Sequence, residues 1–131
     1  MENSGLPFNI TVKLEDNFVL LLASGKYSLL NANNLFQISI DSALSNNKSK
    51  ILIDVTDVTG NIPFFDRFQF SEFFAEYKAK HAFREVNKIA VVGQEPIVHD
   101  GKFGETVAVN RGLNVRVYTN MNEAMAWLTN T

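Results

Sequence analysis

The sequence predicts a single α/β domain in which helices flank a mixed, mostly parallel β-sheet. Segments with strand periodicity alternate with segments of helix periodicity along the 131 residues, and strands that alternate with helices pair in parallel through crossovers. We find no linker, internal repeat or low-complexity segment, so one domain is expected over residues 1–131. The predicted order is β-β-α-β-α-β-α-β-α.

The first two predicted strands form a hairpin. Phe8, Ile10, Val12 and Leu14 alternate with polar residues, which is typical of a half-buried strand. A turn at Glu15–Asn17 leads into the apolar run at 18–23, which predicts a more deeply buried strand. The hairpin should add an antiparallel edge to the later parallel strands.

A first helix and a central strand follow. Apolar residues recur at steps of three and four from Leu29 to Leu44, the spacing of one helix face. The polar residues 46–49 end this helix, and the nearly continuous apolar run at 50–55 predicts a strand covered on both faces. We expect residues 56–61 to form a loop, and Pro63 suits the first turn of a second helix.

The remaining elements complete the alternation. Residues 89–92 predict another buried strand, ended by Gly93 and Pro96, and we expect Gly101 and Gly104 to lie in a loop. A third helix is predicted from about Phe103 to Arg111, with Gly112 as its C-terminal stop. A last strand at Val115 and Val117 then leads to a final helix capped by Asn120, with Trp127 anchoring that helix to the sheet.

Composition and motifs exclude several functions. The net charge is −2, which argues against a broad nucleic-acid or anionic-membrane surface. There is no cysteine, and the longest apolar run is too short to cross a bilayer. The N-terminus has no signal-peptide pattern, so the expected location is cytoplasmic. The two histidines, His81 and His99, lack metal-ligand spacing. We therefore expect neither an enzyme nor a bound cofactor.

Two segments carry a family resemblance. The run 51–60 (ILIDVTDVTG), and the run 107–128 with its Glu-Ala-x-x-Trp-Leu ending at Glu123–Leu128, resemble the SpoIIAA-like proteins of the STAS superfamily. The resemblance implies a mixed sheet flanked by helices and a binding or regulatory role. Anti-sigma-factor antagonists of this superfamily are phosphorylated on a serine just before the second helix. Here that turn corresponds to Ile62–Phe65, which has no hydroxyl, so nearby Thr59 is the candidate phospho-acceptor.

The segment 54–60 is one candidate site. It follows a predicted central strand and precedes a helix, the end of an open α/β sheet where ligands and anions tend to bind. On this interpretation Asp57, Thr59 and Gly60 contact a ligand or partner. The alternative is that the Asp and Thr side chains only satisfy loop amides and cap the helix.

The aromatic side of the second helix is the other candidate site. Phe64, Phe65 and Phe68, with Phe73 and Phe74, cover more of the helix circumference than one core stripe requires. Some of these rings should face a partner or a pocket, unless the core is unusually aromatic. Asp66 and Arg67 are expected on the solvated side of the same helix.

Three functions remain open. The leading hypothesis is a non-enzymatic regulatory or protein-interaction module that binds a protein partner or itself as a homodimer. The rival is a carrier or sensor of a small apolar ligand or lipid, because STAS relatives that lack the switch serine are similar to Sec14-type domains. A weaker third hypothesis is an enzyme that uses Asp54, Asp57 or His99 for acid–base chemistry.

Overall fold

A computed structural model describes residues 6–81, 86–110 and 114–130. Side chains are described for most of these residues, but not for several in α2 and α3. The elements, in chain order, are β1 (Asn9–Leu14), β2 (Val19–Lys26), α1 (Leu29–Ser45), β3 (Lys50–Thr59), α2 (Phe64–His81), β4 (Lys88–Val92), α3 (Ile97–Asn110), β5 (Val115–Tyr118) and α4 (Met121–Thr129).

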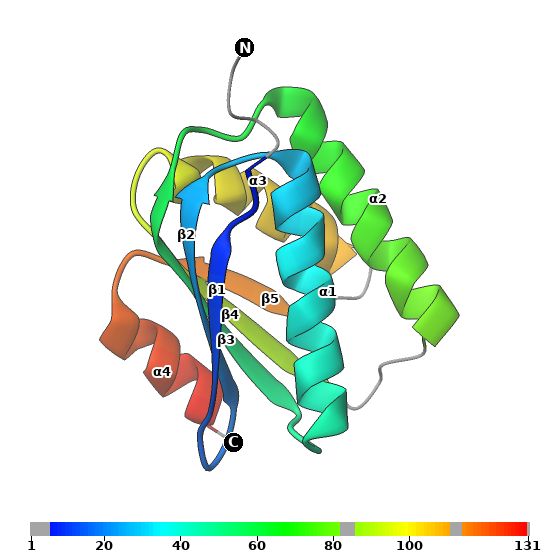
Figure 1. Ribbon diagram of the computed structural model, residues 1–131, viewed down its shortest axis with the longest axis vertical. Helices are drawn as coiled ribbons and strands as arrows, with labels where there is room; N and C mark the ends of the chain where they lie inside the picture. Colours follow the sequence, from blue (N-terminus) through cyan, green and yellow to red (C-terminus); the bar gives the residue numbers. More distant parts are fainter. Residues whose placement is uncertain (1–5, 82–85, 111–113, 131) are drawn as a thin grey trace.

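The strands form one mixed sheet whose spatial order is the order of the chain, β1-β2-β3-β4-β5. β1 runs antiparallel to β2, and β2 to β5 are parallel. Each new parallel strand thus lies on the same side of the strand before it. Right-handed crossovers therefore carry α1, α2 and α3 over the same face of the sheet. Figure 1 shows α1 and α2 on one side of the sheet and α4 on the other. The predicted α/β class and element order are confirmed.

Two hydrophobic cores lie on the two faces of the sheet. The larger core joins the sheet to α1, with Leu21, Ile40 and Ile51 fully buried. The smaller core joins Leu52 on β3 to Leu128 on α4. Because neighbouring residues on a strand point to opposite faces, Ile51 and Leu52 enter different cores. This explains the continuous apolar run in β3.

Strand β1 is covered along only part of its length. Phe8, just before the strand, is buried, and Ile10 packs against the larger core. Val12 and Leu14 on the same face are 42% and 55% exposed. The reason is that α1 packs over β2 and β3 rather than over β1. The predicted half-buried strand is therefore half-buried only toward its beginning.

The end of β3 differs from the sequence prediction. The predicted loop at 56–61 is wrong, because β3 continues to Thr59. β2 also runs further than expected, to Lys26, and its last residues pair with β3, with Ser24 opposite Asp57 and Lys26 opposite Thr59. The register of this pairing shifts between Leu22, which lies opposite Asp54, and Ser24. Backbone pairing between distant segments thus extends a strand that its own apolar pattern ends early.

Helix α3 begins six residues earlier than predicted, at Ile97 instead of Phe103. Ile97 and Val98 are buried, and the backbone N–H of His99 donates to the Glu95 carboxylate at 2.9 Å. Gly101 and Gly104 lie inside the helix, so their assignment to a loop is wrong. Each helical glycine costs about 1 kcal/mol, and burial of the first turn offsets that cost.

The predicted end of this helix, Arg111 with Gly112 as the stop, lies outside the described residues.

Tyr77 ties α2 to α1. It is buried, and its hydroxyl donates to the Asp41 carboxylate at 2.6 Å. Its ring meets Phe36 edge-on and stacks on Phe73. Burial, together with the hydrogen bond to Asp41, raises the pKa of Tyr77 to about 12.

The smaller core yields a stability prediction. Leu128 is fully buried, whereas Met125 on the same helix is 37% exposed. We expect Leu128→Ala to lower the free energy of unfolding by about 3 kcal/mol, and Met125→Ala to change it by less than about 0.5 kcal/mol. Urea unfolding followed by circular dichroism measures both. Equal effects of the two variants would contradict the packing of α4 described here.

Candidate functional site

The candidate site lies where β3 ends and α2 begins. Gly60 follows the strand with a φ of 95°, a left-handed conformation that favours glycine. The chain then reaches Pro63, whose carbonyl accepts from the backbone N–H groups of Asp66 at 3.0 Å and Arg67 at 3.3 Å. Proline has no N–H to satisfy at a helix start, which explains why the helix starts here. Of the predicted turn at Ile62–Phe65, only Ile62 and Pro63 precede the second helix, and Phe64 and Phe65 are its first two residues.

Two phenylalanine rings project from the first turn of α2. Phe64 is 58% exposed and Phe65 is 76% exposed. The Arg67 guanidinium lies 5.9 Å from the centroid of the Phe64 ring, within cation–π range. The same side chain donates through Nε to the Ile62 carbonyl at 3.0 Å. Arg67 is also half-buried, so the predicted position on the solvated side is wrong for it.

Tyr27, at the junction of β2 and α1, holds this turn in place. Its hydroxyl donates to the Asp66 carboxylate at 3.0 Å, and its backbone N–H donates to the Thr59 carbonyl at 2.9 Å. Burial, followed by the negative charge of Asp66, raises the pKa of the Tyr27 phenol well above its usual value. Asp66 is thus half-buried and engaged rather than simply solvated.

Two more exposed apolar side chains lie at the start of α1. Leu30, in its first turn, is 72% exposed, and Leu6 is 62% exposed. The buried Asn31 side chain fixes this segment, because its Nδ2 donates to the carbonyls of Leu6 at 2.8 Å and Lys26 at 3.3 Å. Ser28 caps the helix by accepting from the Asn31 N–H. In Figure 1 the first turns of α1 and α2 lie at the same end of the molecule.

The predicted site residues have different environments. Asp57 and Thr59 lie on β3 and are exposed, as is Gly60 after the strand. The Thr59 hydroxyl approaches the Gly25 carbonyl at 3.5 Å, a weak contact. Phe64 and Phe65 lie together at the start of α2, and the side chain of Phe68 lies outside the described residues.

Sequence reasoning missed Tyr27, Leu30 and Asn31 as members of this end of the molecule. Leu30 carried a signal, because it is apolar but lies off the helix face that begins at Leu29. Tyr27 and Asn31 carried none, since their partners are distant in sequence.

The residues proposed for acid–base chemistry are divided between two elements, β3 and α3. Asp54 and Asp57 are on β3, and His99 is exposed in the first turn of α3. The Asp54 carboxylate accepts from the backbone N–H of Thr56 at 2.9 Å, a local bond. Among the described residues there is no group of three or more acidic or histidine side chains that could hold a metal ion. No helix within the described ranges is long and apolar enough to cross a membrane.

Comparison with known proteins identifies the family. The model of the SpoIIAA-like family matches residues 19–129. The chain belongs to the SpoIIAA-like family. No curated protein matches the chain.

Two solved structures show the same fold. An anti-sigma factor antagonist from Mycobacterium paratuberculosis is 14% identical and superposes with a TM-score of 0.60, over 97% of each chain. An uncharacterized protein with a SpoIIAA-like fold from Shewanella loihica PV-4 is 18% identical and has a TM-score of 0.55, over 93% of each chain. These matches confirm the STAS-type fold that the sequence predicts.

The two tyrosine contacts predict how stability depends on pH. The pKa of each phenol is raised on folding, so the folded state retains a proton that the unfolded state releases above pH about 10. The free energy of unfolding should therefore fall as the pH rises from about 10 to about 12, where Tyr77 ionises in the folded protein. Tyr27→Phe and Tyr77→Phe should each make this fall shallower.

Each variant should also lower stability at pH 7 by about 1 kcal/mol, the typical net value of one hydrogen bond. Urea unfolding at several pH values measures both effects. An undiminished fall in the double variant would show that these two phenols do not cause it.

Proposed function

We propose that this protein is a non-enzymatic regulatory module that binds a protein partner through the first turn of α2. The observation that carries the proposal is the exposure of Phe64 and Phe65, two large apolar side chains held on an ordered helix start. Aromatic side chains that project from a rigid element are typical interface anchors. Membership of the SpoIIAA-like family and the fold shared with an anti-sigma factor antagonist support a regulatory role.

The partner should offer an apolar pocket rather than a charged surface. Acidic and basic side chains at this turn are already engaged, Asp66 by Tyr27 and Arg67 by the Ile62 carbonyl. The first turn of α2 therefore presents aromatic surface with its neighbouring charges partly satisfied. A partner that buries both rings gains hydrophobic free energy, since burying one such ring contributes about 1.5–3 kcal/mol.

The exposure of these rings also bears on the rival function. A ring that is 76% exposed, as Phe65 is, cannot line an enclosed ligand pocket. A carrier of a small apolar ligand would have to use other aromatic side chains. Native mass spectrometry of freshly purified protein tests this function, because a bound molecule adds mass that denaturation removes.

The variant Phe65→Asp tests the proposed interface. Partners retained by the immobilised wild-type chain are identified by mass spectrometry, purified and titrated by calorimetry. We expect Phe65→Asp to weaken such a complex at least about tenfold, because its core loses an anchor and gains a charge. The control is Val109→Asp, which places the same charge at a 51% exposed apolar position near the end of α3. Equal affinity of both variants would refute the proposed interface.

Thr59 is the residue at which we propose that the interaction is regulated. It is exposed and ends the strand that leads into α2. A phosphate there would add a charge of about −1.5 to −2 at pH 7, close in sequence to the aromatic turn that an apolar pocket must cover. Thr59→Glu should therefore weaken the same complex while Thr59→Ala leaves its affinity unchanged. Calorimetry distinguishes them, and a Thr59→Glu complex of wild-type affinity would exclude this mode of regulation.

A further inference from the structure

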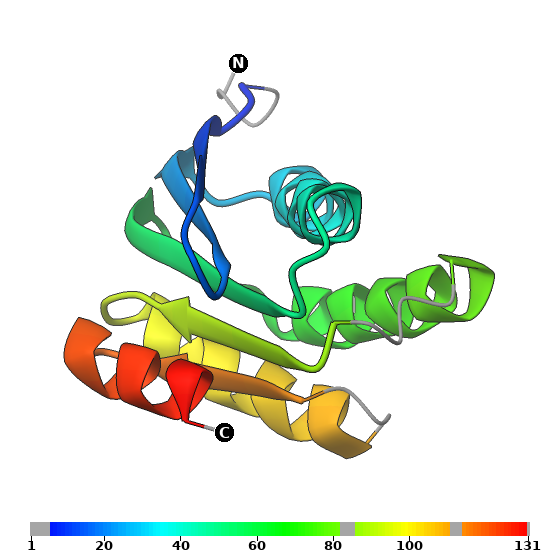
Figure 2. The same ribbon diagram turned by 90° about the horizontal axis from the view of Figure 1, so that it is seen from below.

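The two margins of the sheet are built differently. At the β5 margin, the carbonyls of Asn114 and Tyr118 accept from the backbone N–H groups of Ile89 and Gly93. The backbone groups of Asn114 and Tyr118 therefore point toward β4. Backbone direction alternates along a strand, and the N–H and C=O of Val117 therefore point away from the sheet. Figure 2 shows β1 and β5 at opposite margins.

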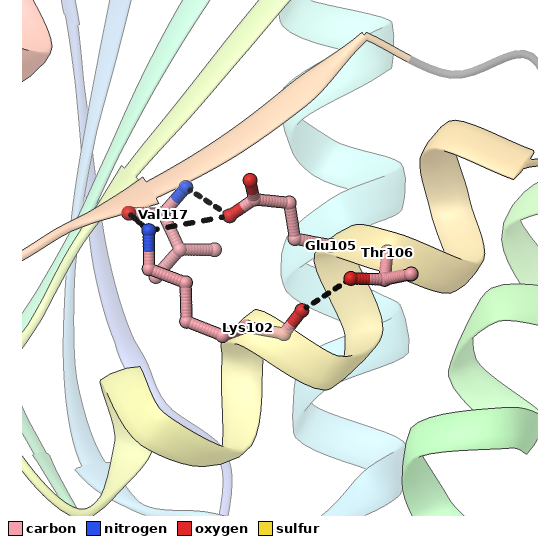
Figure 3. A network of polar contacts seen from close by, with 4 residues as sticks. All are labelled: Lys102, Glu105, Thr106 and Val117. Atoms are coloured by element: carbon pink, nitrogen blue, oxygen red, sulfur yellow. Dashed lines mark hydrogen bonds and ion pairs between the residues drawn. The ribbon is translucent and has the colours of Figure 1, made fainter.

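Helix α3 closes the β5 margin with two side chains. Lys102 donates from Nζ to the Val117 carbonyl at 2.6 Å, and Glu105 accepts from the Val117 N–H at 3.0 Å. The two side chains lie 3.5 Å apart as an ion pair. Figure 3 shows them reaching from the helix to the outer side of the strand. Another strand could pair with Val117 only by displacing both contacts.

Among the residues that the structure describes, no side chain closes the β1 margin in this way. The backbone N–H of Glu15 donates to the Phe18 carbonyl at 2.9 Å, so the backbone groups of Glu15 face β2. By alternation, the N–H and C=O groups of Ile10, Val12 and Leu14 point outward. In the described part of the chain β1 pairs only with β2, and none of the side chains described there bonds to these outward groups.

We propose that β1 is the homodimer interface and that it pairs antiparallel with β1 of a second copy. With a twofold axis perpendicular to the sheet, the faces covered by α1 lie on the same side in both copies. With Val12 opposite its own counterpart, Ile10 lies opposite Leu14 of the second copy. All three residues have outward backbone groups, so each opposed pair can exchange two hydrogen bonds. The two five-stranded sheets then become one continuous sheet.

The side chains of β1 favour a second copy as the occupant. Val12 and Leu14 are 42% and 55% exposed in one chain. In the dimer Val12 would contact Val12 of the second copy, and Leu14 would contact its Ile10. On the other face Lys13 lies opposite Thr11, so no like charges are directly opposed. The two Lys13 side chains are diagonal neighbours at roughly 7–8 Å. Their repulsion is screened by salt, so the dimer fraction should rise with ionic strength.

Sedimentation velocity over a concentration series tests the association. The wild-type chain should show a reversible monomer–dimer equilibrium, and Val12→Pro should shift it to monomer. Proline removes an N–H that points outward, so the pairing with β2 is retained and the thermal midpoint shows whether the fold is intact. A monomeric wild type at every concentration, or a dimer that persists in a folded Val12→Pro variant, would overturn the proposal.

Single cysteines test the register, because the natural chain has none. Two Val12→Cys chains place their Cα atoms about 5.5 Å apart, within the range of a disulfide. Two Thr11→Cys chains are diagonal and lie further apart. Under mild oxidation Val12→Cys should therefore cross-link at least about tenfold faster than Thr11→Cys. Equal rates would overturn the register.

This contact is independent of the proposed α2 site. Phe65→Asp should leave the dimer fraction unchanged, so failure of either proposal can be recognised without the other.

Discussion

The handedness of the crossovers determines most of this structure. The spatial order of the strands is the order of the chain, so right-handed connections carry three successive helices over the same face. The opposite face is then left to the last helix, α4, which covers β3, β4 and β5. Because β2 to β5 are parallel, their carboxyl ends lie at the same end of the sheet, where the connecting helices begin. The candidate site occupies this end for that reason.

At the site, Pro63 marks the start of the helix locally, and tertiary contacts hold the aromatic turn against the end of the sheet. The Tyr27 hydroxyl and backbone N–H connect the beginning of α1 to Asp66 and to the end of β3. The described aromatic side chains of α2 consequently fall into two groups. Phe73 and Tyr77 pack against the larger core, whereas Phe64 and Phe65 extend into solvent. The core interpretation therefore holds for Phe73 and Tyr77, whereas the exposure of Phe64 and Phe65 is what supports the proposed binding surface.

The elements with a strong hydrophobic period were predictable from the sequence. The helix from Leu29, the strands around Ile51 and Ile89, and the Asn120 cap, which accepts from the Glu123 N–H, follow from local patterns. The end of β3 and the start of α3 were not predictable in this way. The end of β3 depends on pairing with β2. The start of α3 depends on burial of Ile97 and Val98, with Ile97 in the larger core.

The same distinction applies to the site. The exposed pair Phe64 and Phe65 belongs to the predicted aromatic side. That side could be recognised from the sequence, because its phenylalanines cover more of the helix circumference than one core stripe requires. Tyr27 was not, because a hydrogen bond between residues 39 positions apart leaves no local pattern. The side chains that close the β5 margin are likewise invisible in sequence, since Lys102 and Glu105 are ordinary helix residues until the fold places them beside Val117.

The two proposed surfaces place a geometric constraint on each other. A twofold axis perpendicular to the sheet at Val12 makes the strands of the two copies antiparallel, so their carboxyl ends point in opposite directions. The first turn of α2 lies at the carboxyl end of the parallel strands, and a β1 dimer therefore carries its two aromatic turns at opposite ends. Neither turn is covered by the dimer contact. A small partner can occupy each end independently, without gaining affinity from the second site, because one molecule cannot span both.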